Sequence, residues 1–528
     1  MSTRHLPVSA LVLLGACSAP RSNQPMAREP TLSDRIDEAI RTEMRDNHIP
    51  GAAVVVVQSG RVLHSRGYGV EVAGTERTVS VDETVFRLGS ISKALTSLAL
   101  TRVVERGAVS WDDPVGTFVN GIQNPRGFKE PVRVRNLVTH TGGFDQIGLD
   151  RQIGAFDKPL AERTAMRPSL RAFLEAGNLR RTAPAGTRFR YDTYGIVLAG
   201  LVLEETTGLP FPEAMRRELF APLGMTRSFV EVDDAHRDRL AIGHGYINGE
   251  YRRMPYEVYV TTPASSIDTT AADMGRLLVA LTTDGSNASG RWVAAATLQS
   301  IWDGQFRPHP EFHGGSHGFW EQISVTGSAR RAELTFEHGG SMLGFSNWLA
   351  IVPELNVGIF VTANRNREAG GPRVRLDQIV NPLVVDWLRR SEGPTRAPAP
   401  YPVPKNPIVR DASRYAGTYY YGIYCKTCSA EELERGAWPR GRPTEVTAHE
   451  RGLSIRGDLY VADDEPDVFV RADGERRVFF GNGPGGHVAF FLWENTPETF
   501  ERELTSVPAR EDRGHARVQA SSSLRLRG

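Results

Sequence analysis

Three short groups of residues in this chain have chemically reactive side chains. In the first, Ser90 and Lys93 stand three residues apart, a spacing that places a hydroxyl and an amine on one side of a helix. A lysine held in a desolvated pocket can lose its proton and then remove the proton of the serine, which makes the hydroxyl a nucleophile. The second group contains Tyr191 and the third contains His338. Because Ser-x-x-Lys alone is a weak motif, the elements around it must agree.

The stretch around the serine predicts the most convincing buried helix of the chain. Apolar residues recur at helical spacing from Ile91 to Val103, and Gly107 is a natural C-terminal stop. Ser90 would therefore stand at the positive, N-terminal end of this helix, with Lys93 one turn later.

Other elements predict an α+β domain around this helix. A helix is expected from Thr31 to Arg45, with Thr31 as its N-cap, and Thr270 is expected to cap a second one. A third is expected from about Gly195, just after Tyr191. Strands are expected at 52–57, 62–68, 334–338, 345–352 and 357–362, the first two as a hairpin.

Length and composition indicate a soluble protein of two domains. The chain has 528 residues, of which 40% are hydrophobic and 24% charged, and its formal net charge is +1. A balanced charge gives no general attraction to nucleic acid or to an anionic membrane. We therefore expect small ester, amide or peptide ligands, no nucleic acid, and no cofactor.

The proline-rich residues 393–410 predict a linker between a large domain, residues 31–392, and a small one, residues 411–500. Short β-rich runs beyond the linker alternate with Gly, Asp and Asn turns, which predicts a small antiparallel barrel. These runs are 415–424, 445–455, 468–470, 477–480 and 488–493. The polar residues 501–528 are predicted to be a disordered tail.

Residues 1–17 indicate an export signal, because the apolar run from Leu6 to Ala16 is too short to span a bilayer. The segment that ends at Cys17 resembles a bacterial lipobox, which implies cleavage before Cys17 and a lipid on its sulfur. An ordinary secretory signal is the alternative. Residues 18–30 would be a polar tether, and we expect a lipoprotein on the periplasmic face of a bacterial membrane, held there only by its lipid.

Two further cysteines, Cys425 and Cys428, are separated by two residues. In an oxidising compartment a local disulfide is the first interpretation, and a metal site, which would need two further ligands, is the second. No metal centre is expected.

The motifs, taken in order, resemble the serine β-lactamase and penicillin-binding-protein superfamily, in particular its class C-like branch of esterases and D-aminopeptidases. The resemblance covers roughly residues 32–390 and implies an antiparallel sheet flanked by helices in an α/β sandwich. It rests on FRLGSISKALTSLAL, VRNLVTHTGGF, PAGTRFRYDTYGIVLAGLVLEETTG, TPASSIDTTAADMGRLL and EHGGSMLGFSNWLAIVPELNVGIFVTANRN. The barrel resembles the lipocalin-like domains of some members, and we expect it to restrict the cleft or to help docking and stability.

By position, the resemblance implies that Ser90 is acylated, that Lys93 helps to deprotonate it and that Tyr191 relays a proton to the leaving group. The backbone N–H groups of Ser90 and Ser341 would form the oxyanion hole. His338, Gly340 and Thr193 would line the substrate site.

Two departures from the family pattern bear on the substrate. Thr193 stands where the second motif commonly has asparagine, and His338 stands where the third usually has lysine. A group that titrates near neutrality thus replaces the cation that would bind a substrate carboxylate. We expect an esterase or D-amino-acid peptidase, with weak or absent β-lactam hydrolysis.

Two other functions are possible on the sequence alone. Gly314 to Gly318 spells Gly-x-Ser-x-Gly around Ser316, the nucleophile elbow of α/β-hydrolases, although its flanks lack the required strand and helix. Alternatively, the chain could be a non-catalytic lipoprotein that binds cell-wall fragments in a penicillin-binding fold.

Overall fold

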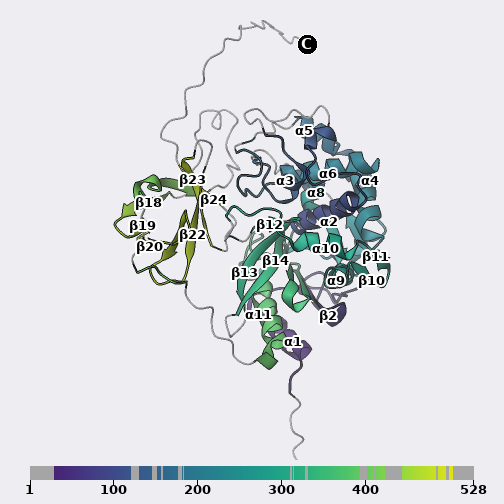
Figure 1. Cartoon of the computed structure of the whole chain (residues 1–528). Coiled ribbons are helices and arrows are strands. Elements are labelled where there is room, and N and C mark those ends of the chain that lie inside the picture. The colour runs from purple at the N-terminus through teal and green to yellow at the C-terminus, as the bar shows by residue number, and fades with distance from the viewer. Residues whose placement is uncertain are drawn as a thin grey trace, which may run out of the picture.

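The computed structural model describes most residues of the two predicted domains (Figure 1). The described residues are 29–119, 130–144, 152–155, 158–176, 181, 183–309, 312, 314–326, 331–392, 401–405, 407, 411–421, 443–482, 486–494 and 499–502. The signal segment with Cys17, the cysteines Cys425 and Cys428 and residues 503–528 of the predicted tail lie outside them, whereas Glu501 and Arg502 belong to a strand. No described helix is both long and apolar enough to cross a bilayer.

A seven-stranded sheet, antiparallel at every pairing, forms the centre of the large domain. In spatial order its strands are β12 (Gly315–Ser316), β13 (Phe319–Thr326), β14 (Arg331–Met342), β15 (Phe345–Val352), β16 (Val357–Ala363), β1 (Gly51–Gln58) and β2 (Arg61–Gly69). The last strand of the domain, β16, thus pairs with the first, β1. The expected β1–β2 hairpin is present, and its two turn residues, Ser59 and Gly60, both have the positive φ that such a turn needs.

Helices cover both faces of this sheet, because β1 alternates between two apolar faces. Ala52, Val54 and Val56 pack with α1 (Leu32–Asp46) and α11 (Leu376–Leu388). Ala53, Val55 and Val57 belong to the larger core on the other face. Figure 1 shows α1 and α11 next to each other at one end of the domain.

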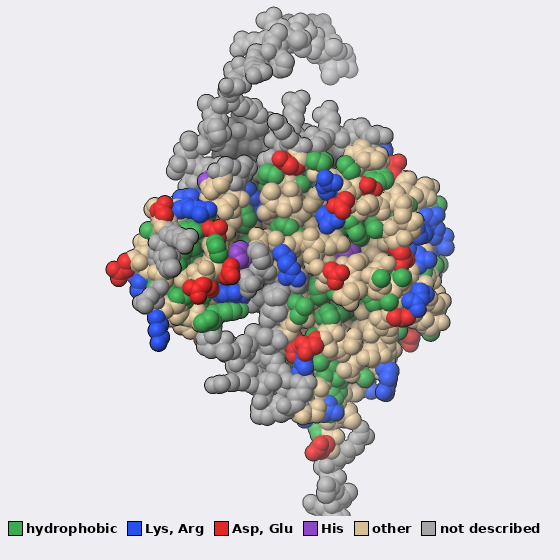
Figure 2. Space-filling view, in the orientation of Figure 1, with side chains coloured by type: hydrophobic (Ala, Val, Ile, Leu, Met, Phe, Trp, Pro, Cys, Tyr) green, Lys and Arg blue, Asp and Glu red, His purple; other side chains and the backbone are tan. Residues whose placement is uncertain are grey.

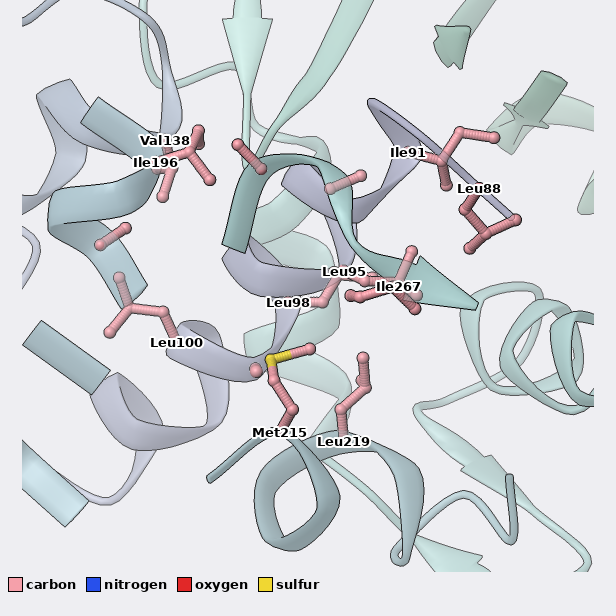
Figure 3. Packing of buried hydrophobic residues seen from close by; sticks show 14 of the residues in the cluster. Leu88, Ile91, Leu95, Leu98, Leu100, Val138, Ile196, Met215, Leu219 and Ile267 are labelled. Carbon is pink, nitrogen blue, oxygen red and sulfur yellow. The ribbon is translucent and has the colours of Figure 1, made fainter. Parts of the chain in front are cut away.

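The larger core surrounds α2 (Ile91–Glu105), which is buried on nearly every side. Leu95 and Leu98 lie near residues of α6 (Tyr194–Thr207), of the segment around Met215 and of β9 (Ile267–Thr270), as Figure 3 shows. The helix predicted from the sequence is therefore confirmed, and Gly107, with φ of 72°, follows its end.

Shorter elements complete the large domain. The helices are α3 (Val134–Val138), α4 (Leu160–Ala165), α5 (Leu170–Ala176), α7 (Phe211–Met215), α8 (Thr262–Ser265), α9 (Ala271–Leu281) and α10 (Ala295–Trp302). The strands are β3 (Val85–Arg87), β4 (Gln152–Ala155), β5 (Ser228–Val230), β6 (His244–Ile247), β7 (Glu250–Arg253), β8 (Glu257–Tyr259), β10 (Ser286–Asn287) and β11 (Gly290–Arg291). They form small sheets such as β3-β9-β5, which lies next to the serine turn.

The C-terminal domain is a closed antiparallel barrel, and this expectation is confirmed. Its strands are β17 (Gly417–Tyr421), β18 (Thr444–His449), β19 (Gly452–Ile455), β20 (Asp458–Ala462), β21 (Val468–Arg471), β22 (Arg477–Asn482), β23 (Val488–Trp493) and β24 (Thr499–Arg502). The single strand expected at 445–455 is wrong, because Glu450 and Arg451 turn the chain between β18 and β19. Strand β20 was not expected.

Candidate active site

Ser90 stands in a tight turn between β3 and α2. Gly89 has φ of 57°, a conformation that favours glycine, and a Cβ there would lie 2.5 Å from the carbonyl oxygen of Ser341. Ser90 is the N-cap residue of α2, so its backbone lies at the positive end of that helix. The turn is thereby pressed against β14 at Ser341.

Lys93 lies one turn into α2, with its ammonium directed at the serine. Its Nζ donates to Ser90 Oγ at 3.1 Å and to the carbonyl oxygen of Ala264 at 3.0 Å, and the side chain is 3% exposed. The first residue of β9 also contacts α2, because Ser92 Oγ accepts a hydrogen bond from the N–H of Ile267 at 3.0 Å. The lysine is therefore held in place from two sides.

Tyr191 faces this lysine from the loop that precedes α6. The Nζ of Lys93 lies 5.0 Å from the centroid of the tyrosine ring. His140 packs against the same ring at 4.7 Å, and its Nδ1 accepts the backbone N–H of Asp192 at 3.2 Å. His140 thus positions the tyrosine loop.

His338 lies within β14, close to its end, and contributes a buried imidazole to the site. The ring is 6.2 Å from the ring of Tyr191, and Nδ1 donates to the carbonyl oxygen of Gly339 at 2.6 Å. Burial, helped by the nearby charge of Lys93, lowers the pKa of His338 from 6.5 to about 3. The expectation that it titrates near neutrality is therefore wrong, because the sequence does not show this burial.

Asn347 of β15 connects the serine turn to β14. Its Nδ2 donates to the carbonyl oxygens of Arg87 at 2.9 Å, Leu88 at 3.2 Å and Gly340 at 3.3 Å. Its Oδ1 accepts from the hydroxyl of Thr362 at 2.7 Å. Since three carbonyls can only accept, they fix the orientation of the amide.

A cavity of about 650 Å³ opens in front of Ser90 and Tyr191. It continues along the end of β14 and reaches the start of α11. Its lining residues include Ser90, Tyr191, His338, Gly339, Gly340, Ser341, Asn347, Trp348, Asn366, Arg367, Glu368, Arg373 and Asp377. Arg367, Glu368 and Arg373 are exposed, so this part of the cavity wall carries both positive and negative side chains.

The structure brings six of the seven sequence-predicted site residues together: Ser90, Lys93, Tyr191, His338, Gly340 and Ser341. Thr193 is the N-cap of α6 and is not among the described residues that line the cavity. No group of three possible metal ligands gathers in the described part of the chain.

Ser316 does not stand in a nucleophile elbow. It belongs to the two-residue edge strand β12, which turns directly into β13, so no helix follows it. Its side chain is completely buried and its hydroxyl donates to the carbonyl oxygen of Ile301 at 2.6 Å. The sheet is also antiparallel, which corrects the alternative of an α/β-hydrolase site at Ser316.

Comparison with known proteins agrees with this arrangement. A sequence profile described as Beta-lactamase matches residues 36–381, which is more than half of the chain. The chain belongs to this family. The match includes Ser90, Lys93, Tyr191 and His338 and ends before the barrel.

Several known proteins resemble the chain. Penicillin-binding protein 4 of Amycolatopsis lactamdurans is 27% identical over 403 residues, which cover 72% of this chain and 95% of that protein. Esterase EstB of Burkholderia gladioli is 31% identical over 204 residues, which cover 37% of this chain and only 50% of that protein. The crystal structure of SurE has a TM-score of 0.58 at 20% identity, with 89% of this chain and 99% of that chain covered, which shows a shared fold.

Two groups in the site had no individual signal in the sequence. The carbonyl oxygen of Ala264 reaches Lys93 from a segment 171 residues away, and Asn347 lies 260 residues from Arg87. The wider segments around both were part of the family resemblance, but neither residue carries a reactive group. Only the folded chain shows what they contact.

Proposed function

We propose that this chain is a serine hydrolase that forms an acyl-enzyme at Ser90 with small esters or peptides. One observation carries the proposal: the Nζ of Lys93 is 3.1 Å from Ser90 Oγ and 5.0 Å from the centre of the Tyr191 ring, and both Ser90 and Tyr191 line the cavity. A nucleophile within hydrogen-bond reach of a base, with a third group beside it, is the arrangement that covalent catalysis requires.

In the first step, Ser90 gives its proton to the base formed by Lys93 and Tyr191 while Oγ bonds to the substrate carbonyl carbon. The carbonyl oxygen becomes an oxyanion, which the backbone N–H groups of Ser90 and Ser341 stabilise; one such donor contributes roughly 3 kcal/mol to lowering the barrier. The bond to the leaving group then breaks, and the leaving oxygen or nitrogen takes a proton through Tyr191. In the second step a water oxygen bonds to the acyl carbon, the bond from that carbon to Ser90 Oγ breaks and the acid is released. One proton of the water passes through Lys93 and Tyr191 to Ser90 Oγ.

The neutral state of His338 supports a preference for substrates without a carboxylate beside this strand. With its pKa lowered to about 3, His338 supplies no positive charge at neutral pH. The relatives named esterase and penicillin-binding protein are consistent with esters or peptides. Among the described residues that line the cavity, Arg367 and Arg373 are the cations available to an acidic substrate group.

The surface is consistent with a small ligand. On the face shown in Figure 2, acidic and basic side chains are interspersed over the described residues. We further propose, from the N-terminal sequence, that the chain is exported and held at the periplasmic face of a bacterial membrane through a lipid on Cys17.

The test is covalent labelling of the purified chain with a fluorophosphonate, with Ser90→Ala and Ser316→Ala as matched variants. We expect mass spectrometry to find the label on Ser90, and to lose it only in Ser90→Ala. Turnover of short acyl esters should exceed turnover of nitrocefin. A chain that does not label at all would instead support the binding-protein function, and labelling that Ser316→Ala abolishes would contradict the proposed nucleophile.

A further inference from the structure

We propose that the C-terminal barrel positions the catalytic loops, by holding the loop that carries Tyr191 and the segment that packs on Lys93. The inference rests on the proposed function, since it concerns the same site. In this proposal Phe490 of the barrel is a positioning residue, and so are Arg188 and Phe312 of the large domain.

The outer face of the barrel has an apolar patch of its own, separate from the barrel interior. Alternation along the strands directs Phe480 and Phe491 inward, while Phe479 and Phe490 face outward. The outward cluster contains one residue from the large domain, Phe312, which is 3% exposed and meets the ring of Phe479 edge-on at 5.4 Å. The two domains are therefore packed together at this point.

Phe312 belongs to a short connection that runs from the barrel patch to α2. Its ends are joined where Phe306 and Gly315 exchange backbone hydrogen bonds at 3.2 Å. Three residues later the N–H of Gly318 donates to Val138 at 2.8 Å. A Cβ on Gly318 would meet Ala94 Cα at 2.8 Å and the carbonyl oxygen of Lys93 at 3.0 Å, so this backbone lies directly against the catalytic helix.

The loop that carries Tyr191 contacts the same patch through Arg188. This arginine is only 9% exposed, and its guanidinium lies 5.2 Å from the centre of the Phe490 ring. Cation–π contacts of this kind gain strength when they are withdrawn from water. The neighbouring Phe189 approaches the connection at Gly315, where a Cβ would lie 3.9 Å from its ring. Two active-site segments thus meet at one face of the barrel.

No barrel residue is among the described residues that line the cavity. The expectation that the barrel restricts substrate size therefore has no support in the described contacts, whereas its contacts with Arg188 and Phe312 point to positioning. Loss of these contacts should slow the chemical step while leaving substrate binding nearly unchanged.

The experiment compares Phe490→Ala and Arg188→Met with the conservative Arg188→Lys, all in the full chain. Arg476→Ala is the control, because it removes a similar contact, 5.6 Å from the Trp493 ring, at a barrel site away from the loops. Readouts are kcat and KM for a short acyl ester, the rate of fluorophosphonate labelling from pH 6 to 9, and hydrogen exchange of the segments 186–194 and 312–318.

We expect Phe490→Ala and Arg188→Met to lower kcat and the labelling rate by roughly tenfold or more, with KM changed less than threefold, because small misplacements of catalytic groups are costly. Arg188→Lys should restore most of the rate and Arg476→Ala should have no effect. Exchange in both segments should rise in the two disruptive variants. Folded variants with unchanged kcat and exchange, or a rise in KM alone, would overturn the inference.

Failure of the proposed function would look different. If the unmodified chain does not label at Ser90, the function is wrong, and hydrogen exchange still decides whether the barrel holds the two segments. If Phe490→Ala does not fold, the comparison of Arg188→Lys with Arg188→Met tests the same contact from the side of the large domain, without altering the barrel.

Discussion

Replacing Asn347 by aspartate should weaken both the fold and the nucleophile, because its amide ties the serine turn to β14. Aspartate has the same shape and keeps an acceptor for Thr362, but it cannot donate to the carbonyls of Arg87, Leu88 and Gly340. Asn347 is 7% exposed, so water does not easily replace the lost donor.

The size of the effect follows from the number of bonds lost. A buried group left without its partner costs about 1–3 kcal/mol, and the amide serves its two closest carbonyls, at 2.9 and 3.2 Å, most strongly. We expect Asn347→Asp to lower the free energy of unfolding by roughly 3 kcal/mol. Because Ser90 and Ser341 would separate, labelling of Ser90 should slow by roughly a hundredfold, the effect of a displacement of about 1 Å.

Thr362→Val is the matched control, since it removes only the bond on the other side of the amide. It should cost about 1 kcal/mol and leave labelling nearly unchanged. Urea unfolding of the large domain and fluorophosphonate labelling rates measure both quantities. If Asn347→Asp labels as fast as the unmodified chain, or Thr362→Val slows labelling equally, Asn347 does not hold the nucleophile in place.

Three further outcomes are expected. Burial lowers the pKa of His64 from 6.5 to about 4, so between these pH values the unfolded chain binds a proton that the folded chain does not, and the free energy of unfolding should fall as the pH drops from 6.5 to 4. In His64→Gln the pH slope of this free energy, measured by urea unfolding, should be smaller by about 1.4 kcal/mol per pH unit. Equal slopes in the two proteins would contradict this. Arg373→Ala should raise KM for esters with a carboxylate more than for neutral esters, and equal changes would show that Arg373 does not bind the carboxylate. Gly340→Ala should leave little folded, active protein, because a Cβ there would lie 2.0 Å from the carbonyl oxygen of Leu88; a stable variant that labels normally would contradict this close approach.

Features set by neighbouring residues could be predicted from the sequence. Thr31 accepts the N–H of Asp34 and receives the reciprocal bond, as a capping box should, and Thr270 accepts the N–H of Asp273. Gly208 ends α6 in the left-handed conformation, with φ of 66°. These contacts span three or four residues, so the local pattern contains all the information that they need.

The barrel shows where local patterns are insufficient. Glu450 and Arg451 make the turn between β18 and β19 without proline, so residues 445–455 look like one long strand. In the folded chain the outward Phe490 contacts Arg188, although the two residues are about three hundred positions apart in the sequence. The role proposed for the barrel could therefore be inferred only from the folded chain.

His338 shows why residue type does not by itself define the chemistry of a position. In the sequence it replaces a lysine by a group that ordinarily titrates near neutrality, which would make carboxylate binding depend on pH. In the fold, burial beside Lys93 keeps the ring neutral down to a pH of about 3. Compared with a lysine at this position, His338 therefore supplies no positive charge at neutral pH, and it does not act as a pH switch there. Among the described residues that line the cavity, the remaining cations are Arg367 and Arg373, so a substrate carboxylate would be bound there and not at position 338.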